Sequence, residues 1–154
     1  MFIGVTVDEA SLRLSRNVTG TVFFEFGAFQ FPGRDWNDFV VVTLGWWLDT
    51  TTKLMAAGEG ETELYFMGGP YSLRVALEGS IFKVSRGRDD VETEDSPFNL
   101  EVDAHGFLRA IHDASTTILS ACASRDWMTA DIETLQRSVS RLRICGLDAS
   151  KLTN

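Results

Sequence analysis

The chain has 154 residues, a mass of 17.1 kDa and a formal net charge of −8, and 44% of its residues are apolar. The negative charge argues against direct binding of nucleic acid or of an anionic lipid surface, because both would repel the protein. No apolar run reaches the length of about 18 residues that a membrane-spanning helix needs.

The first predicted strand covers residues 19–31, where apolar side chains recur with a period of two. Phe29 and Phe31 are expected to continue the face opposite to that of Phe24. Gly27 lies within this run and predicts a β-bulge or a close approach of another backbone. Pro32-Gly33 then ends the strand in a turn.

A second strand is predicted over residues 39–48, where nearly every residue is apolar or β-branched. Apolarity on both faces is typical of a central strand that is covered on both sides. Residues 49–57 are ambiguous and fit either an extension of this strand or a short helix.

Three tryptophans fall close together in this region. Trp46 and Trp47 are consecutive, so on a strand they point to opposite faces and cannot form one exposed aromatic platform. We expect at least one of them to pack between the sheet and the helices, and favour this for both. Trp36 lies in the preceding turn and is the only one of the three that could be exposed at the surface.

Four more strands are predicted at residues 61–67, 71–79, 80–86 and 98–102. Turns rich in glycine and proline separate the first three, a spacing typical of an antiparallel meander. The polar segment 86–97 is expected to be a loop.

The hydrophobic period then changes to that of a helix. Asp103 is expected to cap a first helix, and Thr129 a second one with apolar residues at 132, 135, 139 and 142. Strands followed by helices predict an α+β fold, with an antiparallel sheet of about six strands and two C-terminal helices packed on one face. A single domain, 1–154, is expected, with the sheet mainly in 1–102, a helical hairpin over 103–145 and a polar tail over 146–154.

No pattern in the sequence predicts catalysis, a cofactor or a metal site. His105 and His112 lie about 10.5 Å apart along the first predicted helix, whereas two nitrogens on one zinc ion lie within about 4 Å of each other. Cys122 and Cys145 lack metal-binding spacing and are expected to be buried free thiols in a reducing compartment. We therefore expect a protein that is not an enzyme.

The distribution of charge is the strongest polar signal. Residues 1–103 contain 17 acidic and 8 basic side chains, whereas residues 104–154 contain 5 acidic and 6 basic ones. The candidate partner-binding residues are the acidic ones of two segments, Asp89, Asp90, Glu92, Glu94 and Asp95 in one and Glu59 and Glu61 in the other. Such a negative patch speeds the capture of a basic protein, although the sequence of the first segment by itself favours a solvated loop between strands.

Several motifs in the first half of the chain combine aromatic residues with turns, namely Phe31-Pro32, Trp36-x-Asp38-Phe39, a run of valines, Trp46-Trp47 and the later FMGGPY. This set resembles small bacterial immunity proteins that accompany polymorphic toxins, including those of contact-dependent growth inhibition. The likeness covers residues 20–75, with a looser likeness around Trp127. Gly68-Gly69 stands where that pattern has an acidic residue followed by glycine.

The resemblance implies a protein that binds and neutralises the C-terminal domain of one cognate toxin, by covering its active site or binding beside it. Many such toxins act on nucleic acids through basic grooves, so the resemblance and the negative charge together favour a basic nuclease as the partner. It also implies a cytoplasmic protein, which agrees with the lack of a secretory leader in the N-terminal residues. No individual binding residue carries over from the family.

Two alternatives remain open. The acidic cluster also fits a small hydrolase that uses carboxylates, for which converging carboxylates of raised pKa would be the sign. A scaffold module that self-associates through an uncovered sheet face is the other alternative. The leading expectation is a monomer or weak dimer that contacts neither nucleic acid nor membrane.

Overall fold

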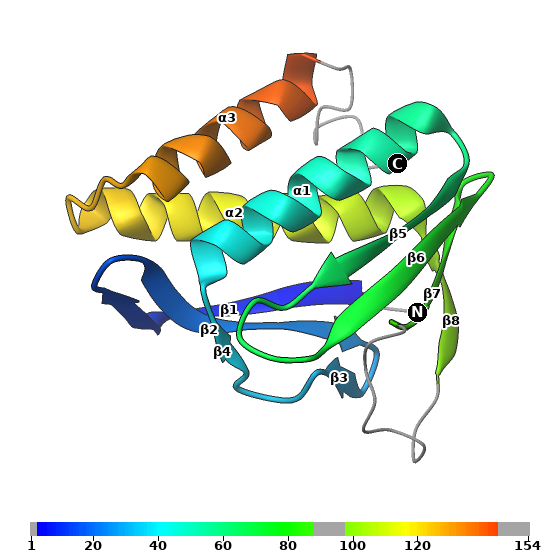
Figure 1. Cartoon of the computed structure of the whole chain (residues 1–154), viewed down its shortest axis with the longest axis horizontal. Coiled ribbons are helices and arrows are strands. Elements are labelled where there is room, and N and C mark those ends of the chain that lie inside the picture. The colour runs from blue at the N-terminus through cyan, green and yellow to red at the C-terminus, as the bar shows by residue number, and fades with distance from the viewer. Residues whose placement is uncertain (1–2, 88–97, 145–154) are drawn as a thin grey trace.

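The computed structural model describes residues 3–87 and 98–144, which form two antiparallel sheets and three helices (Figure 1). The first sheet contains β1 (Ile3–Leu14), β2 (Val18–Phe26), β3 (Phe29–Phe31) and β4 (Asn37–Asp38). The second contains β5 (Gly60–Tyr65), β6 (Ser72–Glu78), β7 (Ile81–Arg86) and β8 (Asn99–Asp103). The helices are α1 (Val40–Ala57), α2 (Ala104–Ser124) and α3 (Ala130–Ile144). The α+β class is confirmed, but the strands form two sheets rather than one.

The first sheet has the order β1-β2-β3, and β4 also pairs with β2. No strand was predicted where β1 lies, and one continuous strand was predicted over residues 19–31. Gly27, with φ of 61°, instead belongs to a tight turn between β2 and β3. This turn pairs Phe31 with Phe24. Directly paired residues share a face of the sheet, so the prediction that Phe31 lies on the opposite face from Phe24 was wrong.

The second sheet is the predicted antiparallel meander, with the order β5-β6-β7-β8. Its inner face carries alternating apolar residues, and Val75 pairs with Val84 and Leu77 with Phe82. All four of these side chains are buried. The period-two pattern located these strands because one face of the sheet is covered and the other is not.

Residues 40–57 form helix α1, so the strand predicted over 39–48 was wrong. Positions 40, 44, 47, 48, 51 and 54 are all buried, and their spacing of three and four residues is helical. Valine and tryptophan have a high strand propensity, but tertiary packing of an apolar helix face outweighs that preference. The ambiguous residues 49–57 are the second half of the same helix.

Both ends of α1 are stabilised by identifiable groups. The buried Asp38 carboxylate accepts hydrogen bonds from the backbone N–H of Phe39 at 2.7 Å and from Trp36 Nε1 at 2.9 Å. At the other end, the backbone N–H of Gly58 donates to the carbonyl groups of Leu54 and Met55. Gly58 has φ of 81°, a left-handed conformation that favours glycine at a helix C-terminus.

The helices form two further layers over the sheets. Helix α2 packs against β1, β7 and β8, and α1 packs against β2 and β5. Helix α3 packs on α1 and α2 and lies on their far side from the sheets (Figure 1). The prediction that both C-terminal helices lie on one face of a sheet is therefore corrected, because α3 packs on helices.

Both predicted N-caps are confirmed. Asp103 accepts a hydrogen bond from the backbone N–H of Gly106 at 2.7 Å, and Thr129 accepts one from that of Ile132 at 3.1 Å. The carboxylate and hydroxyl oxygens thus satisfy backbone donors that the first turn of a helix leaves unpaired.

Replacing Asp103 with alanine should therefore lower the free energy of unfolding by about 1 kcal/mol, because the Gly106 N–H loses its acceptor. Urea denaturation followed by circular dichroism measures this change. Asp103→Asn retains an acceptor oxygen and is the matched control. An equal loss in both variants would show that the cap does not account for the effect.

Candidate binding surface

Helix α1 buries most of its surface but leaves one stripe accessible. One set of accessible positions has helical spacing and consists of Val42, Trp46, Asp49, Thr50, Lys53, Ala56 and Ala57, while the part-exposed Thr52 and Met55 lie beside it. A stripe with this spacing is one face of the helix. It contains an aromatic ring and charged groups next to each other.

The neighbouring Trp47 fixes the rotation of the helix. Its Nε1 donates to the carbonyl oxygen of Tyr65 at 2.8 Å, and its fully buried ring stacks on Phe24 with 4.5 Å between centroids. Consecutive helical residues point about 100° apart. Trp46 therefore points outward, with 49% of its surface exposed.

The predictions for the tryptophans need correction on two points. Trp46 was expected to be packed, yet it is among the most exposed large apolar residues of the described chain. Trp36 was the only one predicted as able to lie at the surface, yet it is half-buried and packs edge-on against Tyr71 with 5.2 Å between centroids. The strand assigned to residues 39–48 explains the error at Trp46, because it gave the side chains of that run the wrong angular spacing.

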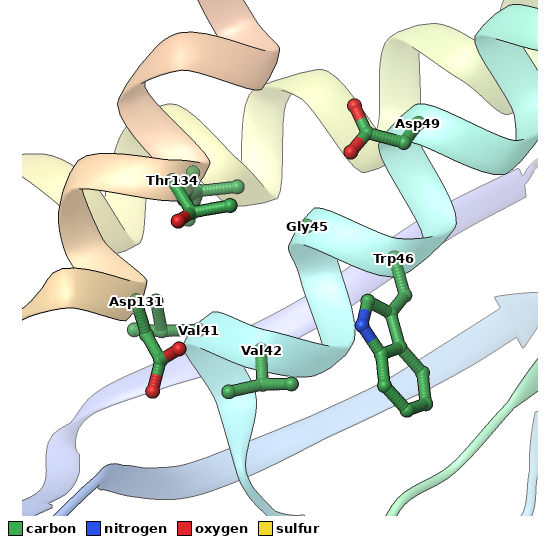
Figure 2. A pocket seen from close by; sticks show the side chains of 8 residues that line it. Val41, Val42, Gly45, Trp46, Asp49, Asp131 and Thr134 are labelled. Carbon is green, nitrogen blue, oxygen red and sulfur yellow. The ribbon is translucent and has the colours of Figure 1, made fainter.

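A small cleft of about 60 Å³ lies between α1 and α3 (Figure 2). It is lined by Val41, Val42, Gly45, Trp46, Asp49, Asp131, Thr134 and Leu135. Figure 2 shows Asp131 and Thr134 projecting from α3, while the Asp49 carboxylate extends from α1 towards α3. Typical small-molecule sites have volumes of about 300–1,000 Å³, so this cleft fits the end of one side chain rather than a metabolite.

The charged groups of the cleft are carboxylates from two helices. Asp49 forms a long ion pair of 3.9 Å with Arg141 of α3, whose side chain remains 55% exposed. Asp131 lies in the first turn of α3, where the helix dipole favours a negative charge. Among the described residues no cation pairs with Asp131. The cleft is therefore apolar at its base and negative at its edges.

Gly45 in the cleft is an unfavourable residue for its position. It is buried in the middle of α1, where glycine costs about 0.5–1 kcal/mol relative to alanine. A Cβ atom added to Gly45 would lie 3.9 Å from Leu135 Cδ1, an ordinary van der Waals contact. Helix stability and packing both favour alanine here, so neither explains the glycine.

Two of the acidic residues predicted from sequence lie at the other end of the exposed stripe. Glu59 and Glu61 are both exposed, at the junction between α1 and β5. With Thr50, Lys53 and Ala57 of α1, they line an open groove of about 350 Å³. We refer to the stripe, the cleft and this groove together as the α1 surface. Its charged groups are Asp49, Lys53, Glu59, Glu61, Asp131 and Arg141.

The remaining predicted residues, Asp89, Asp90, Glu92, Glu94 and Asp95, lie outside the described residues. The structure therefore does not place that acidic segment relative to Glu59 and Glu61. Glu63 belongs to β5, the strand that also contains Glu61. It is partly buried, and its carboxylate lies 3.8 Å from the Arg74 guanidinium group. It also accepts a hydrogen bond from Ser72.

The histidines and the described cysteine form no reactive cluster. His105 is exposed, and His112 is largely buried with Nδ1 3.4 Å from the Asp113 carboxylate. Cys122 is a buried free thiol, as predicted, and burial raises its pKa, which disfavours the nucleophilic thiolate. Cys145 lies outside the described residues. No group of three or more candidate metal ligands occurs in the part of the chain that the structure describes.

No family model, curated protein or solved structure matches the chain. Within residues 3–87 and 98–144, no helix has both the length and the apolarity to cross a membrane. The likeness to immunity proteins thus stays a prediction from sequence. The α1 surface is the feature of the structure that bears on function.

Proposed function

We propose that the protein binds the C-terminal domain of a cognate bacterial toxin and neutralises it by covering or flanking its active site. The proposed partner is a basic domain, such as a nuclease. The observation that carries this proposal is the α1 surface, where the half-exposed Trp46 shares a cleft with carboxylates from two helices and two more carboxylates follow at the β5 end of α1. Tryptophan is enriched among the residues that contribute most to protein–protein affinity.

Charge and size also support a protein partner. The formal net charge of −8 favours rapid association with a basic surface. The chain exposes 8033 Å², and a standard interface takes about 800 Å² from each partner. Helix α1, with 18 residues, is about 27 Å long, which is enough to contribute a large part of such an interface.

Co-expression is the direct test of neutralisation. The toxin domain encoded beside this gene should stop growth when produced alone and should be harmless when produced with this protein. The purified pair should also co-elute in gel filtration as a complex. Continued killing in the presence of the folded protein would refute the proposal.

The carboxylates should act mainly on the association rate. Neutralising Glu59 and Glu61 as glutamines should slow association with the toxin domain by about tenfold at low salt, and the difference should disappear at high salt. Stopped-flow measurements over a salt series test this, with Glu9→Gln and Glu101→Gln as a control for lost charge elsewhere. The amide variants of Asp89, Asp90, Glu92 and Glu94 form a second series. Association rates equal to those of the control would show that these carboxylates do not steer the partner.

A further inference from the structure

We propose that the cleft between α1 and α3 binds an arginine side chain of the protein partner. This inference rests on the proposed function and adds the chemistry of one contact to it. The base of the cleft is apolar, Trp46 lines its outer side, and Figure 2 shows the carboxylates of Asp131 and Asp49 towards opposite ends of it, one on each helix. An arginine side chain complements this arrangement, because its apolar stem fits the apolar base and its cationic end fits the carboxylates.

The aromatic wall and the two carboxylates favour arginine over other cations. A guanidinium group is planar, stacks on an indole ring and donates hydrogen bonds in several directions. Carboxylates from Asp49 and Asp131 offer acceptors on two helices. The ammonium group of lysine is more strongly hydrated and does not stack in this way.

The protein itself already brings one guanidinium to this place. Arg141 of α3 approaches Asp49 at 3.9 Å, too far for a strong hydrogen bond, and much of its side chain is exposed. The edge of the cleft therefore accepts a guanidinium group, and Asp131, which pairs with no cation among the described residues, provides a second acceptor. A partner arginine can therefore pair with Asp131, while Asp49 keeps its long contact with Arg141.

Gly45 is a second feature of the cleft that fits the binding of a side chain there. Alanine would improve the helix and would fit against Leu135, yet glycine occupies the position. A residue that lowers local stability without a packing reason is expected at a functional site. An added methyl group at Gly45 would lie on the cleft side of α1 and reduce its volume.

Binding of a small probe tests the chemistry of the cleft. The full chain, labelled with ¹⁵N, is titrated with a blocked Gly-Arg-Gly peptide. Two control titrations use the same peptide with citrulline or with lysine in place of arginine. The arginine peptide should shift the signals of Gly45, Thr134 and the Trp46 indole N–H in a salt-dependent way. Affinity for the citrulline and lysine peptides should be lower by about tenfold or more. Equal affinity for all three peptides, or shifts elsewhere only, would overturn the inference.

Variants connect the cleft to the partner. Gly45→Ala should raise the denaturation midpoint and at the same time weaken binding of both the arginine peptide and the toxin domain by about tenfold, which equals 1.4 kcal/mol. The double variant Asp49→Asn, Asp131→Asn should weaken both to a similar degree, and circular dichroism verifies that each variant is folded. If these variants bind the toxin domain as tightly as the original chain does, the arginine pocket is wrong and neutralisation still stands. If the original chain does not neutralise the toxin domain at all, the proposed function fails, and the peptide titration alone decides what the cleft binds.

Discussion

Replacing Trp47 with alanine is expected to lower the free energy of unfolding by about 3–5 kcal/mol, whereas the same change at Trp46 should alter it by less than about 1 kcal/mol. Trp47 is fully buried, stacks on Phe24 and donates a hydrogen bond to Tyr65. Its removal leaves a large cavity and takes one hydrogen-bond donor away from the Tyr65 carbonyl group. Trp46 has half of its surface in solvent and leaves no such cavity.

The two substitutions are a matched pair, because they remove the same side chain at adjacent positions. Urea denaturation followed by circular dichroism at 222 nm avoids a signal that depends on the tryptophans themselves. Trp47→Phe extends the test if Trp47→Ala does not fold, since it retains an aromatic ring but loses the hydrogen bond to Tyr65. Similar losses from the two alanine variants would contradict the rotation of α1 described above.

Trp46, whose replacement should hardly change stability, is expected to matter most for binding of the partner. Trp46→Ala should weaken the complex with the toxin domain by about 2 kcal/mol, or roughly thirtyfold, because a central aromatic residue contributes most when it is buried by a partner. Isothermal titration calorimetry with the folded variant measures this loss. Trp46 would then contribute to binding and Trp47 to folding, although they are neighbours in the sequence.

The α1 region shows why part of the fold was predictable and part was not. The strands of the second sheet have one buried face, so the period of two was visible, and the caps Asp103 and Thr129 marked the starts of α2 and α3. Residues 39–57 are apolar over most of their length, and a short apolar run fits a buried strand and a buried helix equally well. The length of the run favoured a helix, because strands rarely exceed about ten residues.

The strand predicted over residues 39–48 also concealed much of the candidate site. The acidic residues Glu59 and Glu61 were found from their charge alone, since exposed carboxylates need no structural assignment to be noticed. Trp46, Asp49 and Asp131 come together only when residues 40–57 are a helix and α3 packs on that helix. No local pattern predicts a contact between segments more than eighty residues apart. A helical reading of positions 42, 46, 49 and 53 would have indicated the exposed stripe.

The motifs that carry the resemblance to immunity proteins meet at a structural junction. Trp36 packs against Phe66 and Tyr71, and a Cβ atom added to Gly69 would lie 2.8 Å from its ring. Asp38 links the Trp36 indole to the start of α1. These residues connect the first sheet, α1 and the β5–β6 loop, so they determine the position of α1 and, through it, that of the α1 surface.

Replacing Asp38 with alanine should lower the free energy of unfolding by about 2–5 kcal/mol, because it removes the acceptor of three hydrogen bonds at a site that is only 3% exposed. The donors are Trp36, Phe39 and, at a long 3.5 Å, the Thr43 hydroxyl. Asp38→Asn should cost about 1–3 kcal/mol, since its amide N–H₂ group would face at least one of these donors. Asp35→Asn is the control, because Asp35 is exposed and asparagine tolerates its left-handed φ of 63°.

A double-mutant cycle separates the hydrogen bond from general damage to the junction. Trp36→Phe retains most of the ring but removes the Nε1 donor, so its effect and that of Asp38→Asn should not add. The expected coupling is about 0.5–3 kcal/mol, measured by urea denaturation of the two single variants and the double variant. Strict additivity would show that the Asp38–Trp36 hydrogen bond contributes little to stability. The cost of Asp38→Asn would then come from the two donors in the first turns of α1, the Phe39 N–H and the Thr43 hydroxyl.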